Sequence, residues 1–358
     1  MKKQLILLVS VIITCVSCGG QSSSSSPLSS SEEPKEYFTL WNECTSLAEL
    51  KAFVTEATDP DSENFIPVQD RIATFDMDGT FVGELYPTYF EYNLLEYRAL
   101  DDPNYKDKAP EDVKAAAQNI RDFVREGKPL PNHFDMVHAN AAAKAYAGMS
   151  LAEFDKYVKD YAKTPANGFQ GMTYGESFYK PMLEVFQYLA DNEFTYYVVS
   201  GSDRFICRAL VDSLGIDPRY VIGMDVVLKS SEQGEAEGVN YTMGKEEYLI
   251  RTDELIIKNL KTNKVKQIMQ EIGKTPVLSF GNSSGDSAMH NFCMGNKEYK
   301  SEAFMLVADD DVRDHAYLPE GEKRRKTWEE NGYNIISMKN DFKTIYGYSV
   351  AKTDFIFN

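Results

Sequence analysis

Hydrophobic residues recur along this chain with two different periods, and the changes of period divide it into helices and strands. In segment 47–57 the apolar residues lie three or four positions apart, which predicts an amphipathic helix ahead of the first strand. Helical periodicity returns between Phe81 and about Gly175, in the segments 89–100, 110–125, 138–146 and 151–161. Because this long stretch has few strand signals, we expect it to form a helical subdomain.

Short apolar runs outside that stretch predict the strands of a sheet. They are rich in β-branched and aromatic residues and occupy positions 71–75, 194–199, 276–280, 303–308 and 333–338. Residues 220–228 and 240–243, separated by a turn rich in Gly and Glu, predict a hairpin at the sheet margin. Strands that alternate with helices favour the α/β class with a doubly wound parallel sheet.

Two aspartates, one residue apart, directly follow the 71–75 run. Asp76 and Asp78 would therefore lie at the carboxyl end of a buried strand, where doubly wound sheets bind ligands. Since side chains alternate along an extended chain, Met77 would point the other way and the two carboxylates would share one cleft. Like charges this close need a proton or a cation, and a divalent ion is the natural partner. Taken alone, the pattern is also compatible with a solvated acidic turn.

The amino terminus predicts export. Residues 1–17 combine two lysines with a short apolar run, as in a secretory signal, and the run is too short to span a bilayer. Val16-Ser-Cys18 followed by two glycines resembles the lipobox of bacterial lipoproteins, although Cys15 stands where leucine is usual. The resemblance implies a lipid anchor on Cys18, and an ordinary signal peptide is the alternative. The serine-rich segment 18–36 is expected to be a disordered tether.

Charge narrows the range of partners. With 38 basic and 55 acidic residues the formal net charge is -17, and the one basic cluster, 323–326, is flanked by glutamates. Nucleic acid is therefore not an expected partner. A phosphate-bearing substrate would need a bound metal and local hydrogen-bond donors to create a positive spot in this acidic molecule.

The sequence Asp76-Met-Asp78-Gly-Thr80 after a strand resembles the first motif of the haloacid dehalogenase superfamily, most of whose members are phosphatases. This resemblance implies a Rossmann-like core with an inserted helical cap. It also implies that Asp76 is the nucleophile, forming an aspartyl phosphate, and that Asp78 is the general acid and base. Thr80 places a hydroxyl beside the pair.

Ser200-Gly201-Ser202, at the end of the 194–199 run, resembles the second motif of the superfamily. The resemblance implies that Ser200 and the amides after it bind the phosphoryl oxygens. A helix N-cap at Ser202 or Asp203 is a further interpretation, and the two are compatible because they use different residues.

Two segments further along the chain resemble the third and fourth motifs of the superfamily. Among Lys258, Lys261, Lys264 and Lys266, we select Lys264 as the active-site lysine because it precedes a helical segment as in the superfamily, with Lys261 as the alternative. Gly281-Asn282 to Asp286, after the 276–280 run, resembles the metal-binding motif. It implies that Asp76, the main-chain carbonyl of Asp78, Asn282 and Asp286 hold Mg²⁺, with Asp286 direct or through water. Asp309, Asp310 and Asp311 are either another metal contact or a solvated loop.

These features predict a core domain of residues 37–83 and 176–358 and a helical cap of residues 84–175, which either closes over the cleft or only packs on the core. We expect a Mg²⁺-dependent phosphomonoesterase acting on a small organic phosphate, with no protein partner implied, exported to the periplasm or the outer membrane. Phosphocholine is the first candidate, from a resemblance to secreted phosphorylcholine-phosphatase-like members and from aromatic and acidic residues of the cap that could form an ammonium cage: Glu84, Tyr86, Tyr89, Phe90, Glu91, Tyr92, Glu96 and Tyr97. Phosphoserine or broad-specificity hydrolysis, and non-catalytic binding of phosphorylated nutrients, are the alternatives.

Overall fold

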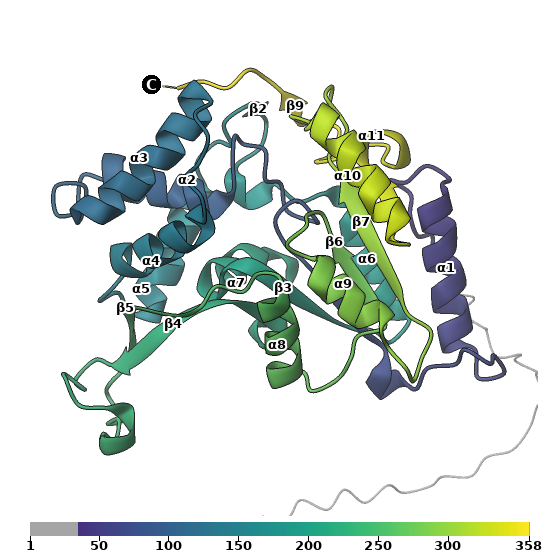
Figure 1. Cartoon of the computed structure of the whole chain (residues 1–358), viewed down its shortest axis with the longest axis horizontal. Coiled ribbons are helices and arrows are strands. Elements are labelled where there is room, and N and C mark those ends of the chain that lie inside the picture. Colours follow the sequence, from purple (N-terminus) through teal and green to yellow (C-terminus); the bar gives the residue numbers. More distant parts are fainter. Residues whose placement is uncertain (1–34, 358) are drawn as a thin grey trace, which may run out of the picture. The chain divides into compact units, whose positions relative to one another are not determined.

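A seven-stranded sheet runs through the unit Tyr37–Asn358 (Figure 1). The structure, a computed structural model, describes residues 35–357; the predicted signal peptide, Cys18 and nearly all of the tether lie outside the described residues. The strands follow the order β5-β4-β3-β1-β6-β7-β8, and all neighbours are parallel except β4 and β5. They are β1 (Ile72–Phe75), β3 (Thr195–Asp203), β4 (Val221–Ser230), β5 (Leu249–Ile257), β6 (Leu278–Gly281), β7 (Glu302–Val307) and β8 (Asn334–Ser337).

Helices cover both faces of the sheet. The α-helices are α1 (Thr45–Thr58), α2 (Phe90–Glu96), α3 (Glu111–Glu126), α4 (Phe134–Ala145), α5 (Leu151–Ala162), α6 (Lys180–Asp191), α7 (Arg204–Val211), α8 (Thr262–Glu271), α9 (Ser287–Met294), α10 (Leu318–Glu330) and α11 (Met338–Asp341). A separate antiparallel pair joins β2 (Phe169–Gln170) to β9 (Ala351–Lys352). The predicted α/β class with a Rossmann-like, mostly parallel core is confirmed.

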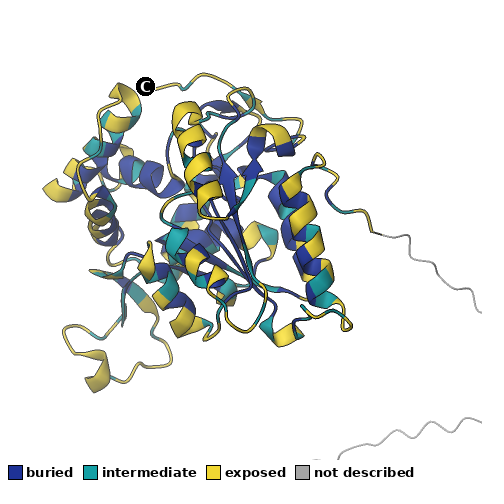
Figure 2. Cartoon of the chain, turned by 45° about the vertical axis from the view of Figure 1, so that its right-hand side comes forward, coloured by how far each residue is buried: buried dark blue, intermediate teal, exposed yellow. Residues whose placement is uncertain are grey.

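Alternation along β7 shows the two packing layers. Phe304 and Leu306 belong to the larger hydrophobic core, which includes residues of α1, α6 and α7, whereas Met305 and Val307 pack with Trp328 of α10. On the α10 side, Val199 of β3 contacts a cluster formed by residues of α8 and α9. The helices turn their buried sides toward the sheet, as Figure 2 shows. Both faces of the sheet are thereby removed from water, as a parallel sheet requires.

The predicted helices of the 81–175 stretch are present as α2 to α5, which gather at one side of the sheet (Figure 1). A capping box begins α5, because the Ser150 side chain accepts from the Glu153 amide at 3.1 Å while Glu153 accepts from the Ser150 amide at 2.8 Å. The helices contact the core, since α4 and α5 pack against β5, and α5 against α7. A cap with the boundaries 84–175 stays a prediction.

The predicted hairpin is wrong in its second strand. β4 does cover the first predicted segment, but its antiparallel partner is β5, and residues 240–243 lie in the connection between them. The connection contains the exposed Val239 and Met243, so it buries too little apolar surface to extend the sheet. Within residues 35–357, no helix combines the length and apolar character needed to cross a membrane.

Candidate active site

The two aspartates lie at the point where the sheet changes direction. From β1 the chain continues to β3, β4 and β5 on one side, and β6, β7 and β8 follow on the other side. The Asp76 amide donates to the carbonyl of Phe280 on β6 at 2.9 Å, which fixes the end of β1 between its neighbours. Such a switch point, at the carboxyl ends of parallel strands, is where doubly wound sheets bind ligands.

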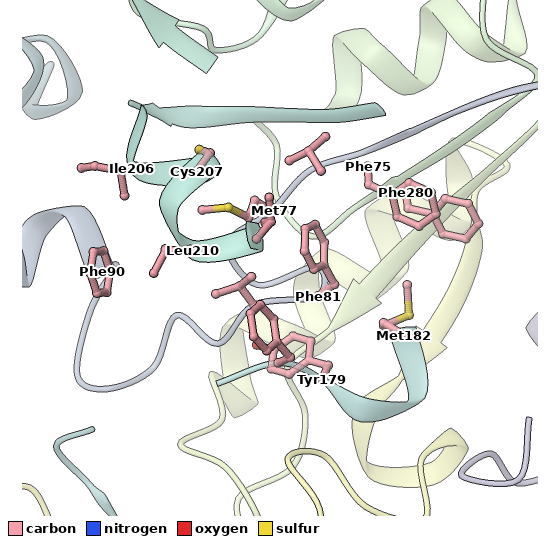
Figure 3. Close-up of a cluster of buried hydrophobic side chains, with 14 of the residues drawn as sticks. Phe75, Met77, Phe81, Phe90, Tyr179, Met182, Ile206, Cys207, Leu210 and Phe280 are labelled. Carbon is pink, nitrogen blue, oxygen red and sulfur yellow. The ribbon is translucent and has the colours of Figure 1, made fainter. Parts of the chain in front are cut away.

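The predicted alternation at the end of β1 is confirmed. Met77 is fully buried in the hydrophobic core, where Figure 3 places it in the same cluster as Phe81 and Leu210. Asp76 and Asp78 instead line a cavity of about 400 Å³. Gly79 then takes a positive φ of 76°, which lets the chain turn without steric strain.

The cavity carries an excess of negative charge. Its wall includes six carboxylates and three basic side chains, from Asp76, Asp78, Glu84, Glu91, Asp135, Asp286, Lys258, Lys261 and Arg324. Tyr89, Tyr92 and Tyr317 add aromatic surface. So many acids around one small space favour a cationic occupant, either a metal ion or a cationic group of a ligand.

Lys264 neutralises two of the acids. It lies in the first turn of α8, is fully buried, and donates to Asp76 and, at 2.7 Å, to Asp286. Burial and the charge of Asp286 raise the pKa of Asp76, and Lys264 opposes this shift. Burial would also raise the pKa of Asp286, but Lys264 outweighs it and the pKa is lowered. Lys261, the alternative, is exposed at the cavity wall, so only Lys264 contacts the predicted nucleophile.

Ser202, rather than Ser200, presents its hydroxyl to the acid pair. The Ser202 hydroxyl donates to Asp78 Oδ2 at 2.7 Å, whereas the buried Ser200 hydroxyl accepts from the Ser202 amide at 3.0 Å and does not line the cavity. Both serines lie where the register of β3 against β4 shifts, between Val199 and Asp203. Asp203 supplies the N-cap of α7, accepting from the Phe205 amide at 2.9 Å.

The other predicted residues near the acid pair are closely packed. Thr80 is buried and its hydroxyl donates to Asp76 Oδ2 at 3.4 Å. Gly201 lines the cavity, and a side-chain carbon there would come within 2.5 Å of Leu260. The Asp78 carboxyl has its pKa raised to about 7 by burial and by the charge of Asp76, and its Oδ1 is buried without a hydrogen-bond partner among the described residues.

The loop after β6 brings Asn282 and Asp286 to the same cavity. Asp286 Oδ2 accepts from the main-chain amide of Asn282 at 3.2 Å. It also accepts from the main-chain amide and the hydroxyl of Ser283 at 3.0 and 3.1 Å, so this carboxylate also anchors its own loop. The Asn282 side chain donates to Glu84 at 3.0 Å.

These donors fit a hard divalent cation. No three His, Cys, Asp or Glu side chains in residues 35–357 converge as a metal site by themselves, so the ligands would have to include an amide or main-chain oxygen. Asn282 and the carbonyl of Asp78 are of this kind, and oxygen is the donor that Mg²⁺ prefers. The buried Asp78 Oδ1 and Glu84 Oε2 lack any partner among the described residues, and a nearby cation would compensate both.

Opposite the acid pair, an ion pair links the predicted cap to the core. Glu91 of α2 accepts from Lys258 at 2.9 Å and from the Asp203 amide at 3.2 Å, and His138 of α4 lies 3.6 Å from the same carboxylate. Burial lowers the pKa of His138 to about 4, so this imidazole is neutral near pH 7. The ion-pair partner of Lys258 is thus Glu91 and not Asp76.

Only some of the aromatic residues predicted for an ammonium cage line the cavity. Tyr89 and Tyr92 line the cavity with their rings 5.3 Å apart, but Tyr86, Phe90 and Tyr97 do not line it. All five lie in or near the predicted helical segment 89–100, but in the structure Tyr97 begins a π-helix, Tyr97–Asp101, after α2, and only two of the five rings face the cavity. Glu96, the last of the predicted cage acids, forms an ion pair with Arg121 at 2.8 Å outside the cavity.

Asp309, Asp310 and Asp311 lie outside the cavity wall, so they offer no further metal contact there, but of the three only Asp311 is exposed as a solvated loop would require, and Asp310 is buried. Asp310 pairs with Arg313 and Asp309 with Arg325. Sequence reasoning missed Asp135, Tyr317 and Arg324 as cavity residues, because each stands in a helical or loop segment with no motif around it.

Fold and site together define the class of this protein. It is an α/β protein with an acid pair and a buried lysine at the switch point of its sheet. No protein family matches the sequence, and no curated protein matches it. Among solved structures, the chain is similar to a conserved functionally unknown protein from Anaerococcus prevotii, with 14% identity, a TM-score of 0.50, and coverage of 85% of this chain and 94% of that one. At this identity the similarity reflects a shared fold.

Two further solved structures match less closely. One is cytosolic 5′-nucleotidase IIIB bound to cytidine, with 14% identity, a TM-score of 0.47, and coverage of 83% of this chain and 88% of that one. The other is a phosphoserine phosphohydrolase-like protein from Francisella tularensis, with 12% identity, a TM-score of 0.41, and coverage of 74% and 94%.

Proposed function

We propose that this chain is a phosphatase of the haloacid dehalogenase superfamily, a Mg²⁺-dependent phosphomonoesterase that acts on a small organic phosphate. The observation that carries the proposal is that Asp76, Asp78 and Ser202 line one cavity. Lys264, which is buried beside the cavity, donates a hydrogen bond to Asp76. A nucleophile, an acid and base, a phosphoryl-binding loop and a neutralising lysine are the parts that such hydrolysis needs.

The residues divide the reaction between them. Asp76, kept ionised by Lys264, attacks the phosphorus while the bond to the leaving oxygen breaks, giving an aspartyl phosphate. Asp78 donates its proton to the leaving oxygen, then takes a proton from the water that releases phosphate and restores Asp76. Ser202 and the amides around Gly201 orient the phosphoryl oxygens. Held by Asp76, the Asp78 carbonyl, Asn282 and Asp286, Mg²⁺ would supply positive charge against those oxygens.

The activity should fall at alkaline pH. The pKa of Asp78 is raised to about 7, so the protonated form that a general acid requires is lost as the pH rises above that value. For an alkyl phosphate at saturating Mg²⁺, we expect kcat/KM to decrease about tenfold per pH unit above pH 7. p-Nitrophenyl phosphate, whose leaving group departs without a proton, should show a shallower decrease. Equal slopes for both substrates would argue against Asp78 as the acid.

Phosphocholine is the proposed substrate, because Tyr89, Tyr92 and Asp135 form an aromatic and acidic part of the cavity wall. A screen of small phosphomonoesters tests this choice. We expect Tyr92→Leu to lower kcat/KM for phosphocholine about tenfold, from a lost cation–π contact, and to leave p-nitrophenyl phosphate almost unchanged. Tyr92→Phe keeps the ring and Tyr97→Leu lies outside the cavity, so both serve as controls. If wild type turns over both compounds equally, there is no ammonium cage.

Lys258 favours phosphoserine or a broader range of phosphoesters as the alternative, since it could pair with a substrate carboxylate if Glu91 released it. Non-catalytic binding is excluded as soon as any phosphomonoester in the screen is turned over.

For the localisation of the protein, we propose an exported lipoprotein of a bacterial envelope, anchored through Cys18 in the periplasm or at the outer membrane.

A further inference from the structure

Glu84 is a buried carboxylate of the cavity wall that forms no ion pair among the described residues. It is 4% exposed and lines the cavity beside Asp76 and Asp78. Its Oε1 accepts from Asn282, while its Oε2 is buried without a hydrogen-bond partner within residues 35–357. Arg324, a basic residue of the same wall, is ion-paired with Glu320, and its charge only partly opposes burial and the charges of Asp78 and Asp76, which raise the pKa of Glu84 well above its usual value. Burying a carboxylate without a neutralising partner is strongly unfavourable, so some other group must stabilise Glu84 at this position.

Protonation of Glu84 would not remove the problem. A neutral carboxyl group would gain an O–H donor, and no described residue accepts at Oε2. A positive charge that enters the cavity would satisfy the group, and the acid pair in the same cavity needs such a charge too.

The contact with Glu84 also decides the orientation of Asn282. The amide nitrogen faces Oε1 at 3.0 Å, because the opposite orientation would set a carbonyl oxygen against a carboxylate. The Asn282 carbonyl oxygen is consequently turned away from Glu84. The turn that carries Asp78 packs directly on this pair, since a side-chain carbon at Gly79 would lie 1.8 Å from Asn282 Nδ2 and 2.6 Å from Glu84 Cδ.

We propose that Glu84 and Asn282 together replace a single metal-binding acid: Asn282 supplies the oxygen ligand, and Glu84 supplies the missing negative charge and holds the amide in place. Glu84 is thus a positioning residue that acts through Asn282. The inference rests on the proposed function, because it assumes a divalent cation beside Asp76 and Asp78. Second-sphere groups of this kind tune metal affinity in many proteins.

Mg²⁺ binding in the absence of substrate tests the inference. Titration calorimetry with Mg²⁺, and electron paramagnetic resonance with Mn²⁺ as a probe, would compare wild type with E84Q, N282D and the double variant E84Q/N282D. E84Q keeps the acceptor for Asn282 and removes only the charge, so we expect Mg²⁺ affinity to fall about 10- to 100-fold. Adding N282D to E84Q returns one acid to the site and should recover most of that loss.

In wild type the same N282D change sets two carboxylates against each other, so it should lower the melting temperature of the metal-free protein. E254Q, an exposed Glu→Gln change on β5, is the matched control and should bind Mg²⁺ as wild type does. Circular dichroism would establish that each variant is folded, and if E84Q alone does not fold, the double variant carries the test.

The outcomes separate the inference from the proposed function. If wild type binds Mg²⁺ and E84Q binds it equally well, solvent satisfies Glu84 and the inference fails while the proposed function stands. If N282D gains or loses affinity equally in both backgrounds, the two residues do not act as a pair. If wild type binds no divalent cation, the Mg²⁺-dependent function itself is contradicted.

Discussion

Replacement of Asp76 with asparagine should abolish turnover of phosphomonoesters, with a loss of at least about 10³-fold in kcat. The amide keeps the shape of the side chain but removes the nucleophilic oxygen charge that begins the reaction. Because Lys264 would still pair with Asp286, the folded state should persist in this variant. Steady-state kinetics with phosphocholine and p-nitrophenyl phosphate would measure the loss.

Asp253→Asn is the matched control for this experiment. Asp253 is exposed on β5 and does not line the cavity, so the same chemical change should leave kcat unaltered. Thermal melting of both variants would separate a lost reaction from a lost fold. Substantial turnover by Asp76→Asn would remove Asp76 from the role of nucleophile.

The second large effect concerns stability. Lys264→Met should lower the free energy of unfolding by about 3–5 kcal/mol in metal-free buffer, because it leaves Asp76 and Asp286 buried without their counter-ion. Urea denaturation followed by circular dichroism would measure the change. Methionine approximates the volume of the lysine stem, so most of the loss would come from charge.

Two further variants qualify this result. Lys261→Met, three residues earlier and exposed, should change stability by no more than about 0.5 kcal/mol. Adding Asp286→Asn to Lys264→Met removes one of the two unpaired acids and should recover part of the loss. A Lys264→Met protein as stable as wild type would mean that the two aspartates share a proton instead of depending on the lysine.

The position of the acid pair was predictable because it depends on local rules. An apolar strand followed by Asp76 and Asp78 needs only side-chain alternation to place both acids on one side and Met77 on the other. Lys264 and Asp286 were also predictable as candidates, but through the resemblance of their segments to the third and fourth motifs of the superfamily. Their contact with one another joins α8 to the loop after β6, and only the folded chain shows it.

Other features of the site depend on irregular geometry or remote contacts. Ser202 and not Ser200 donates to Asp78, and both serines lie where the register of β3 shifts, an irregularity for which a sequence pattern carries no signal. The partner of Glu84 is Asn282, 198 positions away, so the pair emerges only when β1 and β6 lie side by side. Helical spacing suggested one aromatic cluster around Tyr92, but packing decides which rings reach the cavity.

The central claim is that an acid at the end of β1 carries the phosphoryl group between substrate and water. Rapid acid quenching during turnover of radiolabelled phosphocholine with Mg²⁺, followed by peptide mapping, tests it most directly. We expect up to one labelled phosphoryl group per chain, on the peptide that contains Asp76, and no label in Asp76→Asn. Rapid turnover with the label on another residue would contradict it.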